Sequence, residues 1–595
     1  MSEIRCNCSI CSLACPLILR GGERSPVFTG EALLSLDWDT AEGSKYGGSL
    51  CARGAAMVEF VSHPERLNYP LVLGERTTYA AAVTETAKGL AAVRDASGGD
   101  AIGVVLGENL TNEEAALAQR FARDVLGTSN VALFAPDDIP LQRAWLEIDL
   151  SGLRPAGAKP SGEKEVYLLI GDCFTEHPCT AKVVAAGKYA KRGNEVIVVS
   201  PDRNHTAWFA SRHLLCRPGG EAAVAAGLLK AVAGKSGAQL TPGLKQLVGG
   251  LEWSEIERLG GVGKDAIEGA AGAMLGAAKL ETYVSNIFGR FASPGLVSLL
   301  AEAATRICPG ETTYEPQFVQ QNTWGIYSVI GGDGAGPLLE KIENAGLKAL
   351  VVLGVDLFSA FPAAQVEKAV RESTFIVATQ LFRGQTAERA NVVVPAAGLV
   401  EKRGTVSPTV GEEIVREKTI DPPGGAVSDE RFLIDVAAEM GVSLAAGPAQ
   451  RRTARSGAGD GIAAEWTAYT AVMRGLDAAE VVMIPWSEAV HAADGTISRN
   501  LHWSKVTCAE PLLMVSPAVA EELQVGDGDR VKVTTEGGET VLAVKRTGTL
   551  EGRTVAATIH FPAVRRLFPW KRDERHGEIE LAPVPVTLGR HSEKS

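Results

Sequence analysis

The 595-residue sequence predicts a multidomain α/β protein that ends in an all-β module. The length is the first observation, because it predicts about three to five domains. The second is a recurring pattern of short apolar runs that alternate with helical stretches, which is typical of parallel sheets covered by helices. The third is a change of character after residue 480, where short β segments and glycine-rich turns predict a barrel.

The composition indicates a globular protein and argues against two kinds of binding partner. Hydrophobic residues make up 45% of the chain and charged residues 22%, as in globular proteins. The net charge of −12 argues against nucleic acid or an anionic membrane surface as the main partner. No run of about 20 apolar residues predicts membrane insertion. The start, MSEIR, has neither a secretory pattern nor a twin arginine, so we expect a cytoplasmic protein.

Four of the ten cysteines lie in one stretch near the start, CNCSICSLACP. In the cytoplasm such thiols bind metal more often than they form disulfides. Cys8, Cys11 and Cys15 have the spacing C-x2-C-x3-C, followed by proline, and three thiolates from one tight loop are typical of a cubane iron–sulfur cluster. Cys51 is the best candidate for the fourth ligand, and Cys6 is a spare or a competitor for Cys8. Structural zinc, which usually pairs two C-x2-C knuckles, stays open on spacing alone.

The first α/β unit begins at residue 101. AIGVVLG (101–107) predicts a buried strand, because it is a continuous apolar run that ends in glycine. TNEEAALAQRFARDVLG (111–127) predicts a helix. Thr111 and Glu114 form a capping-box pattern at its start, and Gly127 fits its end.

Two further units follow in the chain. The second has strands at 165–172 and 195–201 around a helix at 180–193, which predicts a parallel β-α-β unit. Two of the predicted strands end in Gly-Asp (171–172) and Gly-Val-Asp (354–356), and ligands of open α/β sheets bind at such carboxyl ends. The third unit has strands at 347–356, 374–380 and 390–395, with a helix at 363–373.

Two stretches predict linkers, namely 151–164 and 445–461, because they are rich in glycine, proline, alanine and charge without apolar periodicity. No Ser-His-Asp or Cys-His nucleophile arrangement is visible in the linear order, so we assign no catalytic residue.

The order of these parts resembles the molybdopterin oxidoreductase superfamily. This family includes formate dehydrogenases, nitrate reductases and the large iron–sulfur subunit of NADH dehydrogenase (complex I). CARG at Cys51, followed by HPERLNYPLV, looks like the segment that contains the family's fourth cysteine ligand. The segment at 111–131 is close to a helix shared by cytoplasmic formate dehydrogenases and the complex I subunit. Further blocks match in the expected order, namely GDCFTEHP, RPGGEAAVAAGL, QTAERANVVVPAAGLVEKRGT and SPAVAEELQVGDGDRVKVTT.

The resemblance covers nearly the whole chain and implies a domain plan and a cofactor. It implies one 4Fe-4S cluster with Cys8, Cys11, Cys15 and Cys51 as ligands, two interleaved Rossmann-like α/β domains and a dinucleotide-binding-like C-terminal β barrel. The expected domains are a cluster domain at 1–60, a first α/β domain at 61–150 and 336–445, a second α/β domain at 165–335, a linker and helix at 446–480, and the barrel at 481–595.

The metal-ligand loop departs from the family pattern. Family enzymes hold molybdenum or tungsten between two pterin guanine dinucleotides, usually with a Cys, selenocysteine, Ser or Asp ligand. In formate dehydrogenases the Cys or selenocysteine, followed by His, comes just after the helix that ends here in GTSNV. This chain has ALFAPDDIP (132–140) there, without Cys, His or Ser. Asp137 or Asp138 could ligate a metal, although a loop or cap role is favoured.

Other departures concern dinucleotide contacts. Gly171-Asp172-Cys173 stands where the family commonly has Gly-x-Asn, Ser200-Pro201-Asp202 stands in place of Asp-Pro-Arg, and Ala390–Pro395 (ANVVVP) in place of ADVVLP. The change at residue 200 removes a carboxylate suited to a guanine edge, and that at residue 202 reverses a charge near a phosphate.

Three further residues have side chains that could contact a cofactor or ligand. Arg53 replaces the Lys often found between cluster and pterin and keeps its positive charge. Cys173 and Cys179 flank FTEHP and could bind a ligand, although buried free cysteines are the favoured interpretation.

The resemblance therefore implies an iron–sulfur electron-transfer subunit of a cytoplasmic, multisubunit, NADH dehydrogenase-like oxidoreductase, a degenerate family member. Its expected partners are a flavin-containing, NADH-oxidising subunit and ferredoxin-like iron–sulfur subunits, because the ferredoxin-like extension of the complex I subunit is missing here. The alternative is a formate dehydrogenase-like enzyme that binds molybdenum or tungsten through two pterin guanine dinucleotides. A third hypothesis is a scaffold protein without redox function that binds structural zinc.

Overall fold

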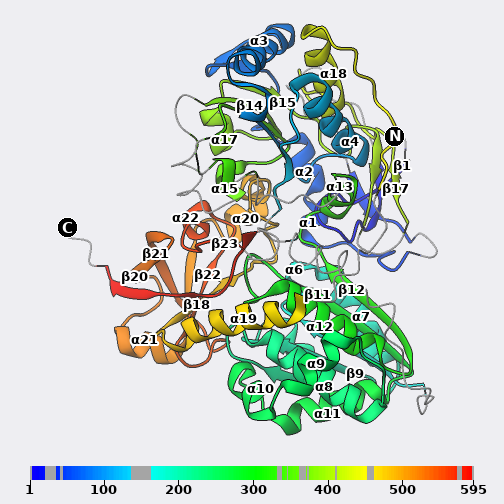
Figure 1. Ribbon diagram of the computed structural model, residues 1–595, viewed down its shortest axis with the longest axis vertical. Coiled ribbons are helices and arrows are strands. Elements are labelled where there is room, and N and C mark those ends of the chain that lie inside the picture. Colours follow the sequence, from blue (N-terminus) through cyan, green and yellow to red (C-terminus); the bar gives the residue numbers. More distant parts are fainter. Residues whose placement is uncertain are drawn as a thin grey trace.

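The fold is a mixed α/β architecture in which two parallel sheets flank a small N-terminal sheet, and a third large sheet lies to one side (Figure 1). This confirms the predicted fold class. The computed structural model describes residues 3–20, 35–40, 44–135, 138, 163–330, 338, 340–342, 344, 346–360, 370, 374–408, 412–451, 461–572 and 579–591. Most of the predicted helix at 363–373, most of the linker at 151–164 and parts of the linker at 445–461 and of the loop at 132–140 lie outside these residues.

The first large sheet has the order β5-β4-β15-β14-β13-β6-β7. Strands β7, β6, β13, β14 and β15 are parallel, and their order along the chain corresponds to the 2-1-3-4-5 arrangement of a doubly wound sheet. Its strands come from two separate stretches of the chain. They are β4 (Leu71–Val72), β5 (Glu75–Arg76), β6 (Ile102–Leu106), β7 (Val131–Leu133), β13 (Ala349–Leu353), β14 (Phe375–Gln380) and β15 (Val392–Pro395).

Local sequence signals in this unit are confirmed. The buried strand β6 occupies the predicted apolar run. Thr111 and Glu114 form both hydrogen bonds of a capping box at the start of α4, and Gly127 ends the helix in the left-handed conformation at φ 73°. The helices around the first sheet are α3 (Tyr79–Ser97), α4 (Asn112–Phe121) with a π-helical turn η2 (Ala122–Leu126), α13 (Thr323–Ile330), α15 (Leu357–Ala360), α17 (Gln385–Arg389) and α18 (Asp429–Glu439), after the short η1 (Gly99–Ala101).

The second large sheet is entirely parallel, with the order β10-β9-β8-β11-β12. This is the 3-2-1-4-5 order, so the chain reverses direction across the sheet between β8 and β11. The loops after these two strands touch closely, since a Cβ at Gly171 would lie 2.1 Å from the carbonyl oxygen of Ser285. The strands are β8 (Glu165–Ile170), β9 (Glu195–Ser200), β10 (Arg212–Leu215), β11 (Lys279–Ser285) and β12 (Glu311–Gln317).

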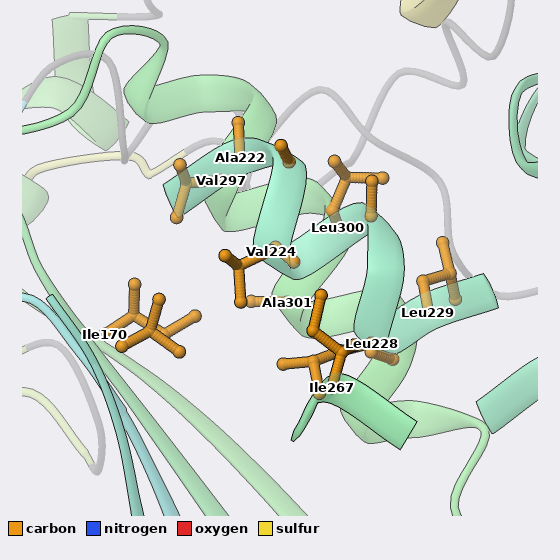
Figure 2. Close-up of a cluster of buried hydrophobic side chains, with 14 of the residues drawn as sticks. Ile170, Ala222, Val224, Leu228, Leu229, Ile267, Val297, Leu300 and Ala301 are labelled. Carbon is orange, nitrogen blue, oxygen red and sulfur yellow. The ribbon is translucent and has the colours of Figure 1, made fainter. Parts of the chain in front are cut away.

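Helices rich in alanine and leucine cover the second sheet. Figure 2 shows part of the core between them, where Val224 and Leu228 of α8 lie close to Ala301 of α12 and Ile267 of α11. The helices are α6 (Cys173–Glu176), α7 (Pro178–Ala190), α8 (Glu221–Ser236), α9 (Pro242–Gly250), α10 (Trp253–Gly260), α11 (Lys264–Leu275) and α12 (Pro294–Arg306), with the short η3 (Ala207–Phe209).

The predicted β module at the C-terminus is a seven-stranded mixed sheet, order β25-β18-β22-β19-β21-β20-β26, which forms a nearly closed barrel. Its core is continuous with that of the first sheet, whereas α19 packs on the helices α9 and α12 of the second sheet, with Trp466, Tyr469 and Met473 in their shared core. The elements are α19 (Ile462–Asp477), β18 (Val482–Trp486), η5 (Ser498–Asn500), α20 (His502–Thr507), β19 (Leu512–Val515), α21 (Pro517–Leu523), β20 (Arg530–Thr535), β21 (Gly538–Arg546), β22 (Thr554–Thr558), α22 (Pro562–Arg565), β25 (Val584–Pro585) and β26 (Thr587–Arg590), with a ribbon of β23 (Lys571–Arg572) and β24 (Ile579–Glu580).

The N-terminal sheet and two short helices lie between the two parallel sheets (Figure 1). They are β1 (Glu3–Asn7), β2 (Pro16–Arg20), β3 (Ser35–Trp38), α1 (Ala52–Ala55) and α2 (Met57–Ser62), with the nearby hairpin of β16 (Gly404–Val406) and β17 (Ile414–Arg416). None of the helices described here is long and apolar enough to cross a membrane. The exact domain limits given above remain predictions.

Candidate functional site

The cysteine loop connects β1 to β2 at the end of the N-terminal hairpin. The amide of Cys8 donates to the carbonyl oxygen of Cys15 at 2.8 Å, and the side-chain amide of Asn7 donates to the carbonyl oxygen of Ala14 at the same distance. These bonds close the loop on itself. Ala14 adopts a left-handed conformation at φ 45°, which tightens the turn before Cys15. As a result, Cys8, Cys11 and Cys15 are all buried.

One cavity brings the four predicted ligands together. Cys51 is the N-cap of α1, and its sulfur accepts a hydrogen bond from the amide of Gly54 at 3.4 Å. A Cβ at Gly54 would lie 3.5 Å from the sulfur of Cys8 and 3.8 Å from that of Cys51, so both sulfurs point at the same small region. The residues that line the cavity are Cys8, Ile10, Cys11, Leu13, Cys15, Leu17, Leu50, Cys51, Arg53, Gly54, Pro178 and Cys179.

Backbone amides are directed at the sulfurs. Besides Gly54, the amide of Ile10 donates to Cys8 and that of Leu13 donates to Cys11. Burial nevertheless raises the pKa of Cys11 to about 11 and that of Cys8 well above its usual range. A bound metal supplies the positive charge that releases such protons, since thiolates are the ligating form. The amides then stabilise the thiolates, which is the arrangement that tunes iron–sulfur sites.

The thiols line a cavity and do not surround the position of a single metal ion. Within the described part of the chain, no three His, Cys, Asp or Glu side chains form a group that could hold one metal ion. Iron–sulfur clusters use thiolates as donors and distribute them over several irons. The set of buried thiols that line the cavity therefore fits a cluster in its donor chemistry.

The other cysteines near the site separate into two kinds. Cys6 faces Leu17 across the β1–β2 ladder, and the lining of the cavity does not include it. The sulfur of Cys173 donates to the carbonyl oxygens of Ile170 at 3.7 Å and Tyr283 at 3.9 Å, as expected for a buried free cysteine. Cys179 differs, because it lines the cavity and belongs to the same buried cluster as Cys15, against which Cys51 packs. The sequence indicated that Cys179 could bind a ligand but favoured a buried free cysteine, and no spacing rule connects Cys179 to the N-terminal loop.

Arg53 is the charged residue in the wall of the cavity. It is only 2% exposed, and the ionisable groups of Cys51, Cys11 and Glu176 lie close enough to raise its pKa despite burial. One terminal nitrogen donates to the carbonyl oxygen of His491 at 3.0 Å and the other to that of Glu176. Arg53 therefore joins the cysteine cavity to the second sheet and the C-terminal module.

Asp138 is the described member of the Asp-Asp pair, whereas Asp137 lies outside the described residues. The buried carboxylate of Asp138 accepts hydrogen bonds from the amides of Val319 at 2.8 Å and Gln320 at 3.2 Å and from the hydroxyl of Thr323 at 2.8 Å. These donors hold the carboxylate to the segment that precedes α13, which is the loop role considered from the sequence.

A larger cavity opens at the switch point of the first sheet, between β6 and β13. Its cavity volume is about 50 Å³. Its lining includes Asn109 after β6, Asp356 after β13 and Gln380 at the end of β14. Ser9, next to Cys8, also lines it, so this cavity lies beside the cysteine loop. Open α/β sheets bind dinucleotides at this position.

The switch point of the second sheet has different chemistry. Arg290 and Asp202 form an ion pair at 2.8 Å, with side chains only 1% and 0% exposed. Asp172 and Glu221 also lie close enough to raise the pKa of Arg290. Burial raises the pKa of Glu221 to about 8. The charge reversal at residue 202 is thus neutralised internally, and the excess of carboxyl groups makes the site a poor fit for a pyrophosphate.

Family models match most of the chain. The model described as molybdopterin oxidoreductase matches residues 66–438, and that described as molydopterin dinucleotide binding domain matches residues 486–585.

Curated relatives are similar at low identity. The alpha subunit of an NADPH-Fe(3+) oxidoreductase from Geobacter sulfurreducens is 25% identical over 444 residues, which cover 67% of this chain and 52% of that protein. The alpha subunit of an F420-dependent formate dehydrogenase from Methanocaldococcus jannaschii is 24% identical over 448 residues, 66% of this chain and 65% of that protein. The catalytic subunit of an assimilatory nitrate reductase from Bacillus subtilis is 25% identical over 493 residues, 73% and 68% of the two chains. The match thus spans only about half the length of the first of these relatives.

Among solved structures, acetylene hydratase from Pelobacter acetylenicus has the same fold. The TM-score is 0.75 at 14% identity, and the match covers 99% of this chain and 100% of that one. At this identity the likeness concerns the fold.

The buried ion pair gives a stability prediction. Asp202→Ala leaves the Arg290 guanidinium buried without its partner, so we expect the free energy of unfolding to fall by about 3–5 kcal/mol in urea denaturation followed by circular dichroism. The matched control is Glu551→Ala, which removes the partner of Arg203 in an exposed pair and is expected to cost less than about 1 kcal/mol. Equal losses in the two variants would contradict the importance of this pair.

Glu221 gives a pH prediction. Its folded-state pKa of about 8 exceeds the ordinary value of 4.5, so between these pH values the folded protein keeps a proton that the unfolded chain has lost. Stability contributed by the neutral carboxyl therefore falls as pH rises through this window. We expect Glu221→Gln to match the wild type at pH 5 and to exceed its free energy of unfolding by more than about 1 kcal/mol at pH 8 in urea titrations. The control Glu521→Gln, at an exposed position of α21, should shift stability equally at both pH values.

Proposed function

The chain belongs to the molybdopterin oxidoreductase family, and on that premise we propose that it is an iron–sulfur electron-transfer subunit. In this proposal Cys8, Cys11, Cys15 and Cys51 hold one 4Fe-4S cluster, which supplies one-electron chemistry. The observation that carries the proposal is the buried cavity that all four thiols line, with backbone amides directed at three of the sulfurs.

The residues around the cavity have defined roles in this proposal. The amides of Ile10, Leu13 and Gly54 stabilise negative charge on the ligating sulfurs and so raise the tendency of the site to accept an electron. Arg53 adds a fixed positive charge beside the same sulfurs. The apolar side chains of the wall exclude water, which strengthens both effects.

Two observations support a relay without its own substrate-converting metal centre. The loop at 132–140 offers no Cys, His or Ser, and the carboxylate of Asp138 is held by three donors of the segment 319–323. At the second sheet, the Arg290–Asp202 pair and its neighbouring carboxyl groups stand where a second dinucleotide would place phosphate. Both sites of the family chemistry are thus altered, whereas the thiol cavity is complete.

We infer a place for the chain in a larger assembly. One relative is by its name the alpha subunit of an NADPH-Fe(3+) oxidoreductase, so it works with at least one other subunit. By analogy, this chain passes electrons between a flavin-containing, NADH-oxidising subunit and ferredoxin-like iron–sulfur subunits in a cytoplasmic complex. The absence of strong positive charge agrees with protein partners rather than nucleic acid.

The second candidate is a formate dehydrogenase-like enzyme with molybdenum or tungsten and pterin guanine dinucleotides. The cavity at the switch point of the first sheet favours it, as does the dinucleotide-binding model matched at 486–585. Asn109, Gln380 and Thr496 offer polar groups in this cavity that suit a nucleotide. The group would supply two-electron chemistry at the metal, and among the described residues those of the cavity after β6, β13 and β14 would hold it.

Metal analysis separates the two candidates. We expect about four irons and a similar amount of acid-labile sulfide per chain, with no stoichiometric molybdenum or tungsten, in protein purified without oxygen and analysed by plasma mass spectrometry. Stoichiometric molybdenum or tungsten would favour the second candidate and overturn the simple relay. Zinc in place of iron would contradict both.

Two single substitutions test the ligand assignment. Cys11→Ala removes a predicted ligand and should abolish the signal of the reduced 4Fe-4S cluster in low-temperature electron paramagnetic resonance. Cys6→Ala, whose sulfur lies outside the lining of the cavity, should leave the signal nearly unchanged. A normal signal in Cys11→Ala, or its loss in Cys6→Ala, would show that the ligands are misassigned.

A further inference from the structure

The cavity holds one thiol more than a cubane cluster needs. Cys179 reaches it from the second α/β unit, whereas the four predicted ligands come from the N-terminal hairpin and α1. Its side chain is buried in the same cluster as Cys15, and Cys51 packs against this cluster. Cys179 is thus close to two predicted ligands at once.

The backbone around Cys179 suits a thiolate. Cys179 is the second residue of α7, directly after Pro178, in a helix of 13 residues. The first turn of a helix presents unpaired amides and a partial positive charge, which stabilise an anionic sulfur. Cys179 therefore lies at the N-terminus of α7 and in the lining of the cavity that Cys51 also lines.

The two thiols differ in their exposure. Cys51 is half-buried, whereas Cys179 is only 5% exposed. By solvent-accessible surface Cys51 is thus the more exposed of the two, and oxidation of a thiolate increases with its exposure. Cys179 belongs to the buried cluster against which Cys51 packs.

We propose that Cys179 is a reserve ligand of the cluster, which takes over the iron of Cys51 when that thiolate is lost. This inference rests on the proposed 4Fe-4S site. In the exchange the S–H bond of Cys179 breaks and its proton leaves to solvent, while a sulfur lone pair forms the S–Fe bond. The bond from the Cys51 sulfur to the same iron breaks, and that thiolate takes up a proton. No electron is gained or lost.

Cys173 is a matched comparison within the same segment. It is also buried, but its sulfur donates to the backbone carbonyls of Ile170 and Tyr283 in a separate apolar cluster. Burial of a cysteine in this part of the chain therefore does not by itself place it at the cavity. Cys179 is set apart because it lines the cavity and belongs to the buried cluster of Cys15.

The test compares cluster content in four full-length proteins reconstituted with iron and sulfide without oxygen. They are the wild type, Cys51→Ala, Cys51→Ala/Cys179→Ala and the control Cys51→Ala/Cys173→Ala. We expect about four irons per chain in the wild type, in Cys51→Ala and in the control, but about three in the double variant that lacks Cys179. Mössbauer spectra and the paramagnetic resonance signal of an oxidised three-iron cluster identify the cluster type independently of any enzyme activity.

The outcomes separate this inference from the proposed function. A wild type without an iron–sulfur cluster would overturn both. If the wild type binds four irons but Cys51→Ala binds a three-iron cluster or none, the reserve role of Cys179 is wrong while the proposed function stands. Four irons in the variant that lacks both Cys51 and Cys179 would also contradict the reserve role. If Cys51→Ala does not fold, Cys51→Ser, which keeps the side-chain volume and is a weaker ligand, provides the same comparison with and without Cys179.

Discussion

The buried guanidinium of Arg53 is the contact on which the arrangement around the cysteine cavity depends. It lies in the wall of the cavity and donates to carbonyl oxygens of Glu176 and His491, which belong to the second α/β unit and the C-terminal module. A buried charge is tolerated only when its donors are satisfied and opposite charge is near. The two carbonyls satisfy the terminal nitrogens of Arg53, whereas its Nε has no hydrogen-bond partner among the described residues. The thiols of the cavity and the carboxyl group of Glu176 lie close to the charge. One side chain therefore links the wall of the cysteine cavity to the second α/β unit and to the C-terminal module.

The switch points of the two parallel sheets differ in their side chains and therefore in what they could bind. Both parallel sheets reverse their strand order at the place where open α/β sheets bind ligands. At the first sheet, loops after β6, β13 and β14 leave a cavity beside the cysteine loop. At the second, the side chains of Asp202 and Arg290 satisfy each other. The two sheets differ in strand order, and the side chains at their switch points differ in charge.

Much of the fold could be predicted because it follows from local patterns. Apolar runs predicted β6, β8 and β9, and the capping box at Thr111 predicted the start of α4. The helix predicted at 180–193 instead spans Pro178–Ala190, because proline is favoured in the first turn and the chain becomes extended at Lys191. The spacing of Cys8, Cys11 and Cys15 predicted a ligand loop. The position of Cys179 and the pairing of Asp202 with Arg290 could not be predicted, since each depends on tertiary contacts between distant segments.

The interleaved first sheet also constrains how the chain folds during synthesis. β6 obtains its neighbour β13 only after the whole second sheet, residues 165–317, has been made. At about 5–20 residues per second, the interval between Leu133 and Ala349 lasts roughly 10–40 s. During that interval one edge of the apolar strand β6 has no partner strand, and an unpaired edge is a template for aggregation. The second sheet, whose strands are contiguous in sequence, can close first. In the nascent chain the second sheet can therefore be folded while the first sheet is still incomplete. Strands β6 and β7 are exposed during this interval, so we expect a chaperone to bind there.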